Sequence, residues 1–158
     1  MSEKLTVTLP SDLEIVMTRV FDAPRALVFE AHSRCEHLTQ WFAGGSPGST
    51  MDCELDFRPG GRYRYVETTD DGSVHAFRGE IREVVAPERI VQTFEYEGMP
   101  GHISVETLEF TEEGGKTRLT TTAVFTSRED RDGMVSSGME EGAGRAYDKL
   151  EALLRTLV

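Results

Sequence analysis

The stretch that decides the fold is residues 138–154, GMEEGAGRAYDKLEALL, which follow a long run of strand-and-turn sequence. Apolar side chains recur here at intervals of three and four, the spacing of one face of an α-helix. The stripe consists of Val135, Met139, Gly142, Ala146, Leu150, Leu153 and Leu157, with Ala143, Tyr147 and Leu154 beside it. This pattern predicts one amphipathic helix that packs against an antiparallel sheet.

Three glycines, Gly138, Gly142 and Gly144, lie in the same stretch. Each costs roughly 1 kcal/mol relative to alanine in a helix interior. Such a cost indicates a close backbone approach, a bend, or space left for another group. A helix on a curved sheet with unfilled space is an architecture that holds small ligands.

Composition limits the classes of partner. The 158 residues are enough for one domain, which we place at residues 13–158 behind an N-terminal arm or edge strand at residues 1–12. Lysine and arginine number 17 against 28 acidic residues, a net charge of -11. This charge repels phosphate backbones and anionic membrane surfaces, so we expect neither nucleic acid nor membrane insertion.

The two cysteines, Cys35 and Cys53, form no CxxC pair, and residues 1–5 lack the apolar run of a signal peptide. We therefore expect a reducing cytoplasm as the location. In that compartment a structural disulfide is disfavoured. The sequence does not decide whether the two thiols lie close together.

Alternation of apolar and polar residues predicts strands over much of the chain. A strand at 13–21 leads to Pro24, which suits the first turn of a short helix, and a second short helix follows. The later strands are expected at 51–57, 62–67, 74–85, 90–97, 103–111 and 117–125. The fold class is therefore α+β, with a curved antiparallel sheet of about six or seven strands, two short helices after the first strand and a long C-terminal helix.

Six segments resemble a known family in the expected order. They are TRVFDAP at 18–24, WF at 41–42, RPGGRY at 58–63, APER at 86–89, GGKTRLT at 114–120 and GMEEG at 138–142. The chain resembles bacterial proteins related to the C-terminal domain of the activator of the ninety-kilodalton heat-shock chaperone ATPase. That family belongs to the SRPBCC superfamily, also called START-like, Bet v-like or polyketide cyclase-like. The resemblance implies a helix-grip fold, with a cavity between the long helix and the sheet that takes lipids, steroids or polyketides.

Two departures from the family matter. The position where the family leads us to expect tryptophan in the long helix is Ala143, which implies a larger cavity. The co-chaperone itself also has a separate N-terminal chaperone-binding domain, for which this chain has no residues left over. We therefore do not expect chaperone binding.

Two kinds of chemistry are disfavoured by the residues themselves. Residues 44–48 match a G-x-S-x-G nucleophile motif, but Pro47 lacks the N–H that an oxyanion hole needs after Ser46. The four histidines, His32, His37, His75 and His102, show no metal-binding spacing. We expect no metal and no other cofactor.

Glu106 and His75 are the candidate proton-transfer groups. Strand parity places His75 on the same face as Phe77, and Glu106 on the same face as Leu108 and Phe110. A carboxyl group in an apolar cavity has a raised pKa and can act as a general acid or base. The alternative is that Glu106 pairs with an arginine or reaches solvent at the strand end.

Aromatic residues are the candidate cavity lining, with core filling as the alternative for most of them. Tyrosine hydroxyls need partners when buried, so the tyrosines are candidate polar groups inside the pocket. The predicted ligand-binding residues are Trp41, Tyr63, Tyr65, Phe77, Phe94, Tyr96, His102, Met139, Ala143 and Tyr147.

Three functions remain open at this stage. The first is binding of a hydrophobic small molecule in the helix-grip cavity. The second is a cofactor-free cyclase, lyase or hydrolase that uses Glu106 and His75. The third is a protein-binding module that resembles the co-chaperone. The sequence also leaves a homodimer open.

Overall fold

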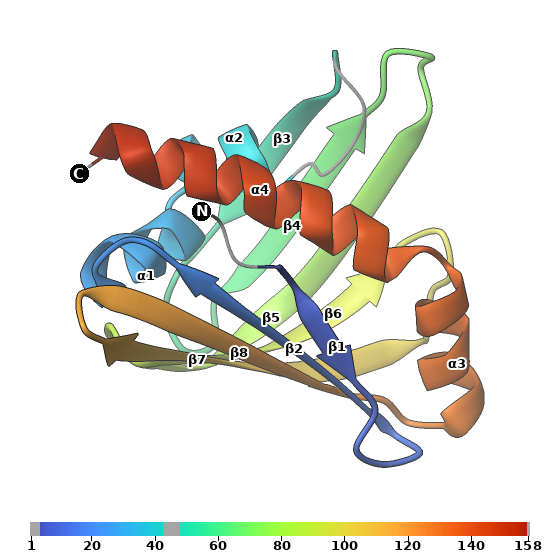
Figure 1. The fold of residues 1–158 in the computed structure, drawn as a ribbon. Coiled ribbons are helices and arrows are strands. Elements are labelled where there is room, and N and C mark those ends of the chain that lie inside the picture. Colours follow the sequence, from blue (N-terminus) through green and yellow to red (C-terminus); the bar gives the residue numbers. More distant parts are fainter. Residues whose placement is uncertain (1–3, 43–47, 158) are drawn as a thin grey trace.

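The computed structural model describes residues 4–42 and 48–157. In the described residues, two strands and two short helices precede six further strands, and two more helices follow (Figure 1). In chain order the elements are β1 (Thr6–Thr8), β2 (Glu14–Phe21), α1 (Arg25–Ser33), α2 (Cys35–Trp41), β3 (Thr50–Leu55), β4 (Arg62–Thr68), β5 (Val74–Val85), β6 (Arg89–Tyr96), β7 (Ile103–Glu113), β8 (Lys116–Val124), α3 (Arg128–Ser136) and α4 (Met139–Leu157).

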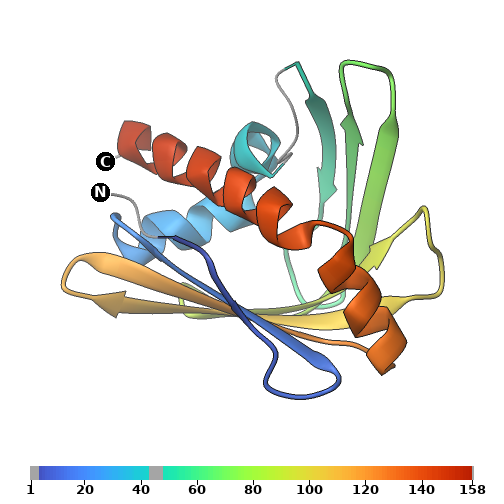
Figure 2. The same cartoon turned by 45° about the vertical axis from the view of Figure 1, so that its right-hand side comes forward.

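The strands form one antiparallel sheet in the order β1-β2-β8-β7-β6-β5-β4-β3. The sheet curves, and α1, α2 and α4 all lie on its concave side (Figure 2). The predicted helix-grip fold is confirmed, although the sheet has eight strands because residues 6–8 also pair with β2. None of the helices in the described part of the chain is long and apolar enough to cross a membrane.

The C-terminal helical region is divided at Gly138. α3 ends at Ser136 and α4 begins at Met139, and between them Gly138 has a φ of 87°. Only glycine adopts this left-handed conformation without strain, so the chain bends there. The prediction of a single helix from Val135 onward was therefore wrong, because of a bend that the apolar spacing does not reveal.

The core lies between α4 and the concave face of the sheet. Leu150 and Leu154 of α4 are fully buried, and Trp41 of α2 packs in the same cluster. Other members of this cluster are Phe21, Val28, Phe29, Leu38, Ile81, Ile90, Phe110 and Leu119. The helix therefore holds the sheet in its curved form by burying an apolar face that the sheet cannot cover alone.

A histidine is part of this core. The His32 ring of α1 lies tilted beside Trp41 at 4.8 Å and meets the edge of Phe110 at 5.2 Å, both distances between ring centroids. Its Nδ1–H donates to the Val28 carbonyl oxygen at 2.8 Å, whereas Nε2 has no partner. Burial lowers the pKa of His32 to about 4, despite the opposing hydrogen bond to Val28. The folded protein therefore holds His32 neutral at pH 7.

We expect His32 to make the protein less stable in mild acid. Between pH 6.5 and about 4 the unfolded chain binds a proton that the folded chain does not, so stability falls as pH falls. From pH 7 to pH 4.5 the loss from this group is about 2.5 kcal/mol. Urea unfolding of the wild type and His32→Phe at both pH values measures it. An equal acid loss in both proteins would contradict the account.

Cys35 and Cys53 form a disulfide bond. Cys35 is the first residue of α2 and Cys53 lies in β3, and their Cα atoms are 5.6 Å apart. The expectation of two reduced thiols was wrong, because it rested on the compartment and the fold brings α2 against β3. A cytoplasmic location stays a prediction. The bond ties α2 to the edge strand of the sheet.

We expect this bond to contribute about 3 kcal/mol, because it closes a loop with a sequence separation of 18 in the unfolded chain. The double variant Cys35→Ser/Cys53→Ser should therefore unfold at lower urea concentration by that amount. Thiol titration of the denatured, unreduced protein provides the control. Two reactive thiols before reduction would show that the bond does not form in solution.

Candidate ligand-binding site

Aromatic side chains gather on the concave face of β4, β5 and β6. Tyr65 lies opposite Phe77, and Phe77 lies opposite Tyr96. Phe94 stacks on Phe77 with ring centroids 5.5 Å apart. Phe42, which follows α2, meets Tyr65 at 4.9 Å and Phe77 at 6.1 Å. Three strands and one helix end therefore contribute to one group of rings.

Burial divides these aromatic residues into two sets. Trp41, Tyr63, Tyr65 and Tyr147 are buried and belong to the core. Two of them also have backbone partners, because Trp41 Nε1 donates to the Ala31 carbonyl at 2.9 Å and the Tyr63 hydroxyl donates to the Thr93 carbonyl. The second set comprises Phe42, Phe77, Phe94 and Tyr96, which remain partly exposed. These four rings present apolar surface on the inner side of the sheet.

Glu106 is a carboxyl group on the same face. In β7 it lies between Ser104 and Leu108, both buried, and its Oε1 accepts a hydrogen bond from Gln92 Nε2 at 3.0 Å. The hydrogen-bond partner of Glu106 is therefore the Gln92 amide and not an arginine, and Glu106 does not lie at the end of its strand. Oε2 accepts no hydrogen bond from the described residues. Burial raises the pKa of Glu106, and the Gln92 hydrogen bond opposes the shift.

Three tyrosines lie within electrostatic reach of Glu106. Burial is the main cause of the raised pKa values of Tyr63 and Tyr65, and the Glu106 charge adds to both. Burial likewise raises the pKa of Tyr147 to about 12, again with a contribution from Glu106. The interior therefore contains a small polar group, a carboxyl among phenolic hydroxyls, within an apolar surface.

The structure separates the two predicted proton-transfer groups. His75 Nδ1 lies 2.9 Å from the Tyr96 hydroxyl, so His75 joins the aromatic group and not the Glu106–Gln92 pair. His102 is half exposed, and its Nδ1 lies 2.7 Å from Asp130 of α3. The segment with Ser46 and Pro47 lies outside the described residues. Within the described ranges no group of three or more His, Cys, Asp or Glu side chains could hold a metal ion.

The predicted residues of α4 have different surroundings. Tyr147 stacks on Trp41 at 5.9 Å and meets the edge of Phe21 at 5.5 Å. Ala143 lies one turn earlier on the helix and is partly exposed. Met139 packs against a smaller apolar cluster formed by Ile15, Ala123 and Phe125. A ring at position 143 would therefore stand beside Tyr147, above the concave face.

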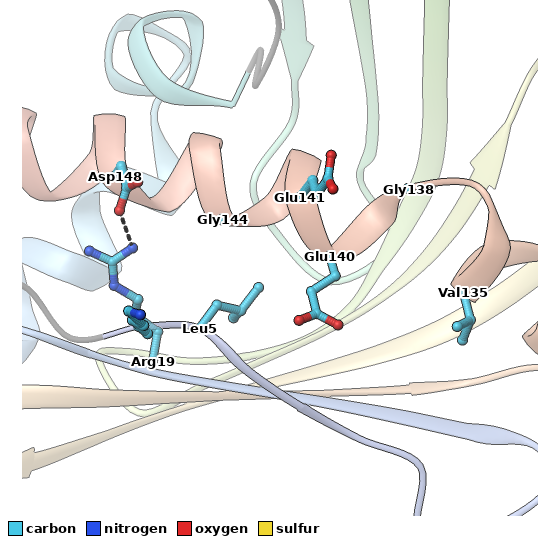
Figure 3. A pocket seen from close by; sticks show the side chains of 9 residues that line it. Leu5, Arg19, Val135, Gly138, Glu140, Glu141, Gly144 and Asp148 are labelled. Atoms are coloured by element: carbon cyan, nitrogen blue, oxygen red, sulfur yellow. Dashed lines mark hydrogen bonds and ion pairs between the residues drawn. The ribbon is translucent and has the colours of Figure 1, made fainter.

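A hollow of about 700 Å³ opens on the other flank of α4, beside β1 and β2 (Figure 3). Leu5 and Arg19 contribute from the strand side, and Gly144 and Asp148 from the helix. None of the predicted site residues lines it. Arg19 was missed although it shares strand parity with the buried Phe21, and an arginine at an inward position was the available signal.

Substitution by alanine should change the stability in opposite directions at Gly144 in α4 and at Gly138 in the turn before it. A Cβ at Gly144 would meet no atom within 4 Å, so Gly144→Ala should add about 1 kcal/mol of stability. Gly138→Ala should instead lose about 1–2 kcal/mol, because its φ is 87°. Urea unfolding of both variants measures the difference. Destabilisation by Gly144→Ala would show that a neighbouring group occupies the space.

The sequence matches the family described as activator of Hsp90 ATPase homolog 1-like protein over residues 22–155. The chain belongs to this family. The expected relationship is thereby confirmed, and the helix-grip architecture is in keeping with it. The description names the family and does not by itself give this member a chaperone partner. No protein of curated function matches the sequence.

Solved structures of bacterial proteins share the fold over nearly the whole chain. A protein from Rhodobacter sphaeroides is 23% identical with a TM-score of 0.89, covering 97% of this chain and 99% of its own. One from Mycobacterium smegmatis is 28% identical with a TM-score of 0.84, covering 95% and 96%. One from Rhizobium leguminosarum is 29% identical with a TM-score of 0.69, covering 99% of both chains. These similarities establish the architecture but not the ligand.

Proposed function

We propose that this family member binds a hydrophobic small molecule between α4 and the concave face of the sheet. The observation that carries the proposal is the set of four partly exposed rings, Phe42, Phe77, Phe94 and Tyr96, on the inner side of the fold. Exposed apolar surface on a concave face is typical of ligand sites. Flat lipophilic molecules fit best, because rings favour offset-stacked or edge contacts with other rings.

Polar groups near the rings would give such a site its specificity. Glu106 offers the Oε2 atom that no described residue uses, and the His75–Tyr96 pair lies beside Phe77. A mainly apolar pocket with a few hydrogen-bonding groups recognises lipophilic molecules that carry hydroxyl or carbonyl substituents. Aromatic and polyketide-like compounds have this character.

A thermal-shift screen with flavonoids, fatty acids, sterols and aromatic polyketides, followed by native mass spectrometry of the hits, tests the proposal. A ligand at one hundred times its Kd should add about 2.7 kcal/mol of stability. Ala143→Trp should abolish the shift by filling the space beside Tyr147. Ala152→Trp, at an exposed position of the same helix, is the matched control and should keep the shift. Hits that survive Ala143→Trp would place the ligand elsewhere.

A cofactor-free enzyme is the second candidate, favoured by the enclosed Glu106 and its raised pKa. A carboxyl group that keeps its proton closer to neutral pH can donate it to a bound substrate and take it back. Glu106→Gln should then keep ligand binding and lose turnover of any hit that is converted. Glu109→Gln, on the exposed side of β7, is the control. Unchanged turnover in Glu106→Gln would exclude Glu106 as the catalytic group.

A further inference from the structure

Polar side chains lie at both ends of the aromatic group on β5 and β6. At one end Gln92 Nε2 donates to Glu106 Oε1 at 3.0 Å. At the other end His75 Nδ1 lies 2.9 Å from the Tyr96 hydroxyl. Phe94 lies between Gln92 and Tyr96 on β6, and alternation along the strand puts these three side chains on the same face. One hydrogen-bonded pair therefore bounds the rings at each end.

The strand sets the separation of the two pairs. Gln92 and Tyr96 are four residues apart on β6, and a strand advances about 3.3 Å per residue, so their Cα atoms lie roughly 13 Å apart. Glu106 of β7 lies opposite Gln92. Phe77 of β5 lies opposite Tyr96, and its ring stacks on Phe94 with centroids 5.5 Å apart. The two pairs are thus separated by an apolar surface made of stacked rings.

Three groups position the Tyr96 side chain. Its hydroxyl contacts His75, and its ring lies 5.4 Å from the Phe77 ring, measured between centroids. Gly98 packs against the same ring, because an added Cβ there would meet the ring carbon Cε2 at 2.5 Å and the hydroxyl oxygen at 2.8 Å. A side chain at position 98 would displace the far end of Tyr96 without a clash with the backbone. Gly98 is therefore a positioning residue for this hydroxyl.

Hydroxyl groups suit both ends of this surface. Glu106 Oε2 accepts no hydrogen bond from the described residues, and the Tyr96 oxygen can both donate and accept. A hydroxyl group on a ligand can also donate or accept, so it fits whichever way the proton lies between His75 and Tyr96. A carboxylate would meet the net charge of -11, and an amine would lose the hydration of its charge among apolar rings.

We infer that this site selects an elongated, flat and uncharged molecule with a hydroxyl group at each end, one bound at Glu106 and the other at Tyr96. The rings of the ligand lie along Phe77 and Phe94, where ring contacts are favourable. The inference rests on the proposed function and specifies the ligand of the same site. A molecule with one polar end forgoes the hydrogen bond at the other pair and binds less tightly.

Four trans-stilbenes test this selection: stilbene itself, the para-hydroxy derivative, a two-ended diol with one para-hydroxyl on each ring, and a one-ended diol with both hydroxyls on one ring. The two diols differ only in where the second hydroxyl lies. Protein-observed NMR with signals from Phe77 and Phe94 gives the site and the Kd. We expect the two-ended diol to bind at least tenfold more tightly than the other three. Equal affinities of the two diols would overturn the inference, and this comparison depends on no variant.

Two substitutions connect the selection with the Tyr96 end. Tyr96→Phe keeps the ring and removes the hydroxyl, so the two-ended diol should lose at least tenfold in affinity while stilbene keeps its own. Gly98→Ala keeps the hydroxyl but displaces the ring, and it should weaken the two-ended diol in the same way. Gly142→Ala is the control, because a Cβ there meets no atom within 4 Å. A tenfold preference for the two-ended diol that survives Tyr96→Phe would contradict the assignment of Tyr96.

Two further substitutions address the Glu106 end. Glu106→Gln retains a group that can donate and accept, so the preference for the two-ended diol should persist. Glu106→Leu removes both oxygens and should reduce the preference to that of a molecule with one polar end. An unchanged preference in Glu106→Leu would show that the second hydroxyl binds elsewhere.

The same titrations separate this inference from the proposed function. Stilbenes that shift Phe77 and Phe94 with no gain from the second hydroxyl would overturn the length selection and leave the proposed function intact. Stilbenes that bind without moving either ring signal would overturn both, because the ligand would then lie away from the aromatic surface.

Discussion

The packing of α4 across a single curved sheet is the constraint on which the rest of the structure depends. An eight-stranded sheet has an inner face that no second sheet covers, and one helix must bury its centre. Leu150 and Leu154 do so, fully buried among residues of α1, α2 and the central strands. The helices α1 and α2 share the concave side with α4 (Figure 2). The partly exposed rings lie with β4, β5 and β6, and the hollow of about 700 Å³ lies beside β1 and β2.

A row of rings links the flanks through the core. It runs from Phe21 through Tyr147, Trp41 and Phe42 to Phe77, each ring within about 6 Å of the next. The middle of the row is buried, and Phe42 and Phe77 at one end are partly exposed. The disulfide at the start of α2 fixes the helix that carries Trp41 and precedes Phe42. The rings near the proposed ligand are thus held by covalent as well as apolar contacts.

Much of the sequence interpretation rested on strand parity, which assigns a side chain to one face of the sheet because side chains alternate strictly along a strand. It placed Glu106 with Leu108, and it would have placed Arg19 with Phe21 had that arginine been considered. The bend at Gly138 and the Cys35–Cys53 bond escaped prediction, because each depends on backbone conformation or on long-range packing. The role of the predicted ligand-binding residues stays a prediction. The alternation of residues shows which face of a strand a side chain occupies, but it does not show which ligand contacts that face.

A crystal structure of the protein bound to the strongest hydrophobic ligand tests the central claim most directly. The account predicts ligand density between α4 and β4–β6, in contact with Phe77 and Phe94 and with a polar atom near Glu106 Oε2. Density on the convex face of the sheet, or an inner face closed by its own side chains, would contradict it.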